Sequence, residues 1–256
     1  DEPQPEGGGM IVKTEAIVFR TIEFSESSII ATLFTRSNGV VAVIAKGARK
    51  PKSKFAAYLV PGQALEVVFQ YKPTRNVQTL TDVSYLMKLD QLRFDIEKMA
   101  LVVTTMELAS QVLHENEVNE NLFNLLIHLL KWVDQSSDVS RIIFPYIQLR
   151  IIDQIGIGLQ IDETIETNSS SKGYINIETG TLSGLQEGDQ SVILTEQQLE
   201  FILSALLEKK ASIFEKKLKS DELSGLIEYL DRYIRYHVEG VKPRRSDDIF
   251  EKILNH

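Results

Sequence analysis

The residues with the most distinctive chemistry form a short basic run in the first quarter of the chain. Nine consecutive residues hold five cations and no acid, namely Lys46, Arg49, Lys50, Lys52 and Lys54. Gly47 and Pro51 lie among them and favour a loop over a helix. Cations on a loop can lie along a phosphate backbone, and binding releases counterions, which makes it favourable and salt-sensitive. The run therefore predicts a DNA contact, although charge alone fits a solvated loop that binds nothing equally well.

Residues elsewhere in the chain could extend this contact. Phe55 and Tyr58 follow the run closely and could stack on unpaired bases. Four more DNA-binding cations are expected at strand ends or turns, where each could also be an ordinary surface charge: Arg20, Arg36, Lys72 and Arg75. A second basic cluster near the C-terminus could bind an acidic partner or more DNA backbone, or complement the dipole of a helix C-terminus. Its members are Arg232, Arg235, Lys242, Arg244 and Arg245.

Signatures of catalysis and of metal binding are missing from the sequence. It contains no Walker loop, GxSxG or HExxH motif, and the glycines of residues 156–158 lack the rest of a dinucleotide fingerprint. The absence of cysteine excludes disulfides, thiolate metal sites and a cysteine nucleophile. The four histidines do not have metal-type spacing. We therefore expect no enzymatic activity, no cofactor and no metal, and a hydrolase is the weakest of the functional hypotheses.

The charge of the chain is divided unevenly along its length. The 256 residues carry a net charge of −8, but residues 10–80 hold ten Lys or Arg and four Glu, a net of +6. Residues 81–256 are acidic, and the acidic residues 1–9 are expected to be a disordered extension or tag remnant before a natural start at Met10. No apolar run is long enough for a transmembrane helix, and residues 1–9 do not resemble a signal peptide. We expect a cytoplasmic, nucleoid-associated protein without membrane contact.

The pattern of apolar residues predicts an α+β protein. β-rich runs predict five strands before residue 87, at residues 11–20, 28–36, 40–46, 64–71 and 77–86. Asn38-Gly39 is typical of a hairpin turn between the second and third strands. Five short strands with a long loop at residues 47–62 suit a small closed barrel of the OB-fold type. Closure also removes the exposed edges of so short a sheet.

From about residue 90 the apolar period becomes helical. The pattern predicts an all-α domain over residues 87–256, after a barrel domain over residues 10–86. Residues 156–192 interrupt it, because they are rich in Gly and Ser and favour an irregular insert with at most a short hairpin near residues 174–182. The apolar stripes of these helices are typical of a buried core.

Four runs in the N-terminal region, at residues 12–18, 25–28, 33–35 and 45–50, resemble in order and spacing the opening of the RecO family of bacterial DNA-repair proteins. Near the end, Tyr233, His237, Lys242 and Ser246 resemble the closing pattern of that family. The resemblance implies an OB-fold, binding of single- and double-stranded DNA, and annealing of complementary strands. It also implies work with the partner RecR to load RecA onto strands covered by single-strand-binding protein (SSB), whose acidic C-terminal tail RecO proteins contact.

The sequence departs from the family in one respect. Many members carry a four-cysteine zinc module in the helical domain, but the matching residues 156–184 contain no cysteine. We therefore expect no zinc there, with packing in its place. An alternative function is also open at this point, namely an OB-fold interaction module that binds an acidic peptide and has no direct role on DNA.

Overall fold

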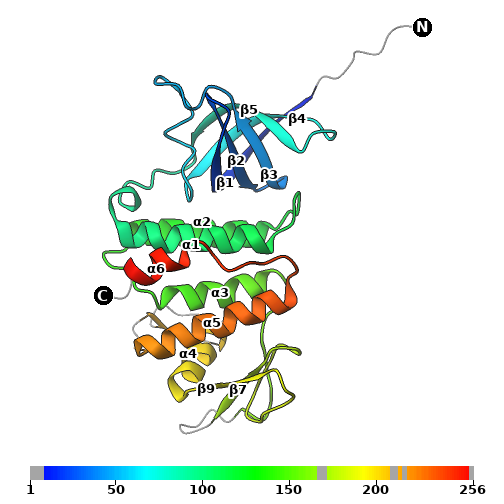
Figure 1. The fold of residues 1–256 in the computed structure, drawn as a ribbon, viewed down its shortest axis with the longest axis vertical. Helices are drawn as coiled ribbons and strands as arrows, with labels where there is room; N and C mark the ends of the chain where they lie inside the picture. The colour runs from blue at the N-terminus through cyan, green and yellow to red at the C-terminus, as the bar shows by residue number, and fades with distance from the viewer. Residues whose placement is uncertain (1–8, 166–171, 208–212, 215–217, 254–256) are drawn as a thin grey trace, which may run out of the picture. The chain divides into compact units, whose positions relative to one another are not determined.

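The computed structural model describes residues 9–165, 172–207, 213–214 and 218–253, and it divides into two compact units (Figure 1). The first unit is Asp1–Ser136 and the second is Ser137–His256. The predicted disordered extension at residues 1–9 lies almost wholly outside the described residues. Each unit is described by itself below.

A five-stranded barrel forms the N-terminal part of the first unit (Figure 1). Its strands are β1 (Met10–Phe24), β2 (Ser28–Thr35), β3 (Gly39–Ala45), β4 (Ala64–Tyr71) and β5 (Val77–Tyr85). They close in the order β1-β2-β3-β5-β4, with β3 and β5 parallel and the other pairs antiparallel. The predicted α+β fold, with an OB-fold barrel before a helical region, is confirmed.

The long first strand closes the barrel because it pairs with two neighbours. Its first half pairs with β4 and its second half with β2, and the register shifts between Val18 and Arg20. Such a bulge bends a strand and increases its twist. Alternate side chains from the five strands, among them Val18, Leu33 and Phe69, fill the interior. The apolar pattern of the sequence therefore sets which side of each strand faces the core.

Helices complete the first unit. The short helix η1 (Leu92–Phe94) leads into α1 (Ile96–Val112), and α2 follows at Glu120–Gln135. Asp95 caps α1 by accepting from the backbone N–H groups of Glu97 and Lys98, at 3.0 and 3.1 Å. The ring of Phe34 in the barrel meets that of Phe123 in α2 at 5.6 Å. The compact unit therefore extends past residue 86, the expected end of the barrel domain.

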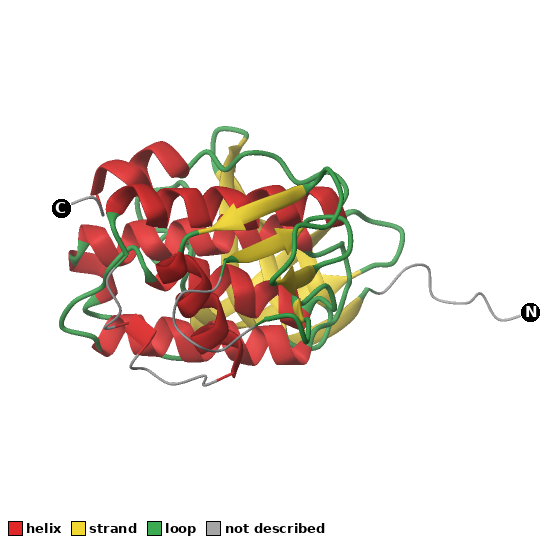
Figure 2. Ribbon diagram, turned by 90° about the horizontal axis from the view of Figure 1, so that it is seen from below, coloured by secondary structure: helices red, strands yellow, loops and turns green. Residues whose placement is uncertain are grey.

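The second unit contains a small sheet as well as helices, and Figure 1 labels two of its strands, β7 and β9. Figure 2 draws all helices in red and all strands in yellow. Its helices are α3 (Ile143–Gln154), α4 (Glu196–Leu207), α5 (Ser220–His237) and α6 (Asp247–Ile253). Its strands are β6 (Gln160–Ile161), β7 (Gly173–Asn176), β8 (Thr181–Ser183) and β9 (Ser191–Leu194), in the order β6-β8-β7-β9.

This sheet corrects the prediction of an irregular insert at residues 156–192. Only its β7–β8 hairpin was expected, because strands of two to four residues are too short to show an alternating pattern. The strands form because they bury Ile175, Leu182 and Val192. Side chains from α5 also hold the insert: the Tyr233 hydroxyl donates to the carbonyl of Ile157 at 2.7 Å, and a His237 ring nitrogen lies 2.8 Å from the carbonyl of Ile177.

Candidate nucleic-acid interface

The basic run forms a chain of turns between β3 and β4, as the sequence predicts. The N–H of Lys50 donates to the carbonyl of Gly47 at 3.1 Å, and the N–H of Ser53 donates to that of Lys50 at 3.0 Å. The side chains of Ala48 and Phe55 are buried in the barrel core and anchor both ends of the run. The prediction that Phe55 stacks on bases is wrong, because its ring is part of the core.

Two of the five cations brace the loop. Arg49 reaches the β1–β2 hairpin, where its guanidinium donates to the carbonyl of Ser25 at 2.9 Å and pairs with Glu23 at 2.8 Å. Lys54 reaches β5, where its ammonium donates to the carbonyl of Thr81 at 3.0 Å and to the carboxylate of Asp82 at 3.2 Å. The hydrogen bond from Lys54 lowers the pKa of Asp82, and a backbone hydrogen bond adds to the effect. These contacts engage both cations within the protein.

All five cations are exposed, but the other three make no such contacts with residues that the structure describes. Lys46, Lys50 and Lys52 are exposed, and within the described residues the structure gives none of them a carboxylate partner. Because the turns and the braces fix the backbone between them, their ammonium groups project from one short, anchored segment. We call Lys46, Lys50 and Lys52 the lysine trio.

Of the four flanking cations, Arg36 is structural. Its guanidinium pairs with Glu15 at 2.7 Å and with Glu120 at 3.1 Å, and it lies 4.6 Å from the centre of the Phe123 ring. It also donates to the side chain of Asn124 at 2.8 Å. The guanidinium joins the barrel to α2, and its predicted role on DNA stays a prediction.

The remaining flanking cations lie at two places on the barrel, apart from the lysine trio. Arg20 is exposed on β1, where it donates to the Thr32 hydroxyl at 3.1 Å. Lys72 and Arg75 lie in the β4–β5 turn. Strands β3 and β5 run parallel, and Ala42 of β3 pairs with Val77, the residue that follows the β4–β5 turn. The lysine trio begins instead after Ala45, where β3 ends. Ala42 lies three residues before Ala45, the last residue of β3, so at least three strand positions, roughly 10 Å, separate the turn from the start of the trio. The structure therefore does not gather these cations into one compact patch.

The C-terminal basic cluster also contains one cation that is held by carboxylates and others that are exposed. Arg244 is buried, donates to both carboxylate oxygens of Asp231 at 2.5 and 2.6 Å, and reaches Asp247 at 2.8 Å. Burial alone would lower the pKa of Arg244, but its contacts with the two carboxylates outweigh burial and raise it. Its predicted contact with a partner is wrong, since these carboxylates occupy the guanidinium. Arg232, exposed on α5, donates to the side chain of Gln190. The other members, also exposed, are Arg235, Lys242 and Arg245.

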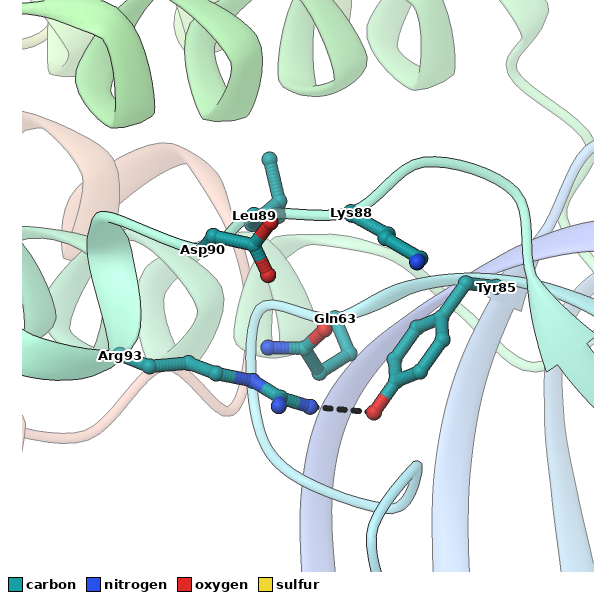
Figure 3. A pocket seen from close by; sticks show the side chains of 6 residues that line it. All are labelled: Gln63, Tyr85, Lys88, Leu89, Asp90 and Arg93. Atoms are coloured by element: carbon teal, nitrogen blue, oxygen red, sulfur yellow. Dashed lines mark hydrogen bonds between the residues drawn. The ribbon is translucent and has the colours of Figure 1, made fainter.

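Tyr58 beside the loop was named from the sequence, but its neighbours Tyr85 and Arg93 were missed. The rings of Tyr58 and Tyr85 meet at 4.4 Å. Arg93 donates to the Tyr85 hydroxyl (Figure 3). These residues are separated by up to 35 positions in the sequence, and none lies in a motif. Only folding brings them together.

Comparisons with known proteins identify the family. The model described as "Recombination protein O N terminal" matches residues 10–87, and "Recombination protein O C terminal" matches residues 93–247. The chain belongs to the RecO family. The gap between the two matches falls where the strand period of the sequence gives way to a helical one.

Full-length relatives agree with this assignment. A protein from Chloroherpeton thalassium named "DNA repair protein RecO" is 27% identical, with 96% of this chain and all of the relative aligned. One of the same name from an Exiguobacterium species is 28% identical over 88% of this chain and 90% of its own. A third, from Salinibacter ruber, is 33% identical over 66% of each chain. Membership of the RecO family supports a role in DNA repair and recombination.

Two further findings concern membranes and metals. Within the parts of the chain that the structure describes, every helix is too short or too polar to cross a bilayer. Those same parts hold no group of three or more His, Asp or Glu side chains placed to bind a metal ion.

Proposed function

We propose that this RecO-family chain is a recombination mediator that binds single- and double-stranded DNA through the lysine trio. The observation that carries the proposal is a contrast among five exposed cations of one basic loop: Arg49 and Lys54 make contacts that hold its backbone, while Lys46, Lys50 and Lys52 have no carboxylate partner among the described residues. Ammonium groups on an anchored segment lose less conformational freedom on binding than those on a free arm. The trio binds phosphates and reads no base edges, which suits a protein that acts on any sequence.

This mode of binding supports strand annealing. A protein that holds only the backbone leaves the base edges of a single strand free to pair with a complement. The chain then anneals complementary strands and, together with RecR, helps to load RecA onto strands covered by SSB. It works without chemistry of its own, as a cytoplasmic, nucleoid-associated protein with no enzymatic activity, no cofactor and no thiolate zinc.

The acidic tail of SSB is assigned to the C-terminal basic cluster. Arg235, Lys242 and Arg245 are exposed there, and Arg232 is exposed beside them. Arg244, next to Arg245 in the sequence, is buried and held by ion pairs with Asp231 and Asp247. The exposed cations complement a carboxylate-rich peptide, and such complementarity chiefly speeds encounter and restricts the choice of partner.

Fluorescence anisotropy with a labelled single strand tests the DNA contact. We expect Lys46→Ala/Lys50→Ala/Lys52→Ala to weaken binding at least tenfold at low salt. The slope of log K against log salt should fall by about 2, since each lost phosphate contact removes about 0.7 on a single strand. The matched control Lys131→Ala/Lys172→Ala/Lys252→Ala removes the same charge at other exposed lysines and should bind like the parent. Equal binding by the two triple variants would refute the assignment.

A further inference from the structure

A small pocket lies beside the basic loop in the first unit. It has a volume of about 200 Å³ and is lined by Gln63, Tyr85, Lys88, Leu89, Asp90 and Arg93 (Figure 3). This volume exceeds that of several water molecules, each about 30 Å³. It is smaller than the roughly 300 Å³ at which sites for drug-sized ligands begin. The pocket therefore suits a single ring system.

An unsatisfied acceptor marks the pocket as a binding site. The Gln63 side chain is only 1% exposed, and its amide oxygen has no hydrogen-bond partner among the described residues. Buried polar groups are nearly always paired, so such an atom calls for an explanation. Asp90 adds a carboxylate to the same lining. The oxygen itself is out of reach of solvent, so a ligand meets it only after the Gln63 amide turns about its last side-chain bond, and the ligand must then offer a hydrogen-bond donor.

Flat and apolar walls complete the pocket. Tyr85 packs on Tyr58, its hydroxyl donates to the carbonyl of Ala57 at 3.1 Å, and the same hydroxyl accepts from Arg93. Leu89 is buried and supplies an apolar surface, while Lys88 is exposed. Tyr58 lies six residues after Lys52, so the wall is continuous in sequence with the end of the lysine trio.

We propose that this pocket receives one unpaired base of a single strand whose backbone lies on the lysine trio. Every base carries at least one N–H donor for the Gln63 oxygen, and its ring packs against Tyr85 and Arg93. Lys88 contacts the attached phosphate. A carboxylate-rich peptide fits less well, because Gln63 and Asp90 would present acceptors to its acidic groups. The inference rests on the proposed DNA binding and adds a separate base-dependent contact.

The test compares a twelve-residue thymidine oligonucleotide with an abasic oligonucleotide of equal length. We expect the parent protein to bind the base-bearing strand about tenfold more tightly, the usual effect of one stacked base. Gln63→Leu removes the acceptor at similar volume and should bring the preference down to about threefold or less. The control Gln70→Leu makes the same change at an exposed site on β4 and should keep the full preference.

A second variant and a melting temperature distinguish loss of the base contact from loss of the fold. Tyr85→Leu removes the flat wall and should also remove most of the preference, while its binding to the abasic strand stays at the parent level. The melting temperature of Gln63→Leu should not fall, because the oxygen that it removes has no partner.

The outcomes separate the two proposals. A parent protein that binds both strands equally would overturn the base pocket and leave the lysine trio intact. A parent protein that binds neither strand would overturn the proposed DNA binding. A poly-aspartate peptide that binds the parent but not Gln63→Leu would also overturn the base pocket, because it would make the occupant a peptide.

Discussion

Single contacts decide which cations of the basic loop can reach a phosphate. Asp82 holds Lys54 at 3.2 Å, and Glu23 holds Arg49 at 2.8 Å. Both pairs are exposed, and such pairs contribute little to stability. Their effect is on the position of the loop and on the charge that it presents.

Releasing Lys54 is therefore expected to strengthen DNA binding. Asp82→Asn removes one negative charge beside the loop and frees an ammonium, so affinity for a single strand should rise a few-fold, with a salt slope larger by about 0.7. Asp189→Asn makes the same charge change at an exposed residue of the second unit and should leave affinity unchanged. Anisotropy titrations measure both, and weaker binding by Asp82→Asn would contradict the account.

The pKa of Asp82 makes substitution a better test than acidification. Lys54 and a backbone N–H lower that pKa below its ordinary value of 3.8 in the folded state. The contact therefore contributes stability above the unfolded pKa, and this contribution is lost as the pH falls through the lowered folded pKa. At neutral pH the carboxylate stays ionised, so Lys54 remains held throughout the range in which DNA binding is measured.

At the scale of elements, the small sheet of the second unit depends on close packing against α5. Gly180 lies between β7 and β8 with φ of +69°, and a Cβ there would meet the Tyr233 hydroxyl at 2.4 Å. Tyr233 in turn donates to the carbonyl of Ile157. The close approach of Gly180 to Tyr233 therefore holds the β7–β8 hairpin against α5.

Gly180→Ala is expected to lower the free energy of unfolding by more than the cost of its backbone conformation. Gly156→Ala is the matched control, because Gly156 has φ of +83° and nothing within 4 Å of the added Cβ. Each variant should lose about 1 kcal/mol or more to backbone strain. Gly180→Ala should lose about a further 1 to 3 kcal/mol to the clash. Urea unfolding measures the difference, and equal losses would show that the contact with Tyr233 has no energetic weight.

Local sequence patterns predict the longer helices and strands but not the shortest strands. Five strands with β-branched residues and helices with long apolar stripes were predictable, since local periodicity specifies them. The strands β6 and β9 were not, because they are short and their partners lie far along the chain. Pro145 sits in the first turn of α3, where no helical N–H is lost.

The candidate site was predictable in position but not in detail. Charge counting located the basic loop, yet Glu23, Asp82, Glu15 and Asp231 decide which cations are engaged, and all four lie at a distance in the sequence. The pocket beside Gln63 has no sequence signal, because its lining comes from the end of one loop, the end of β5, the segment after β5 and η1. Tertiary pairing, rather than composition, sets both features.

At the scale of the whole molecule, charge is divided along the chain. Residues 10–80 carry a net of +6, in a protein whose net charge is −8. An acidic remainder disfavours non-specific contact with nucleic acid, so the proposed DNA binding is expected on the barrel. Membership of the RecO family agrees with this division, since the N-terminal family model covers the barrel at residues 10–87.

The central claim is that the lysine trio carries the action of the protein on DNA. Annealing of complementary strands in the presence of SSB tests it most directly, with the parent, Lys46→Ala/Lys50→Ala/Lys52→Ala and the control triple variant at Lys131, Lys172 and Lys252. The account predicts that the trio variant anneals at least tenfold more slowly, while the control matches the parent. Annealing by the trio variant at the parent rate would contradict the account.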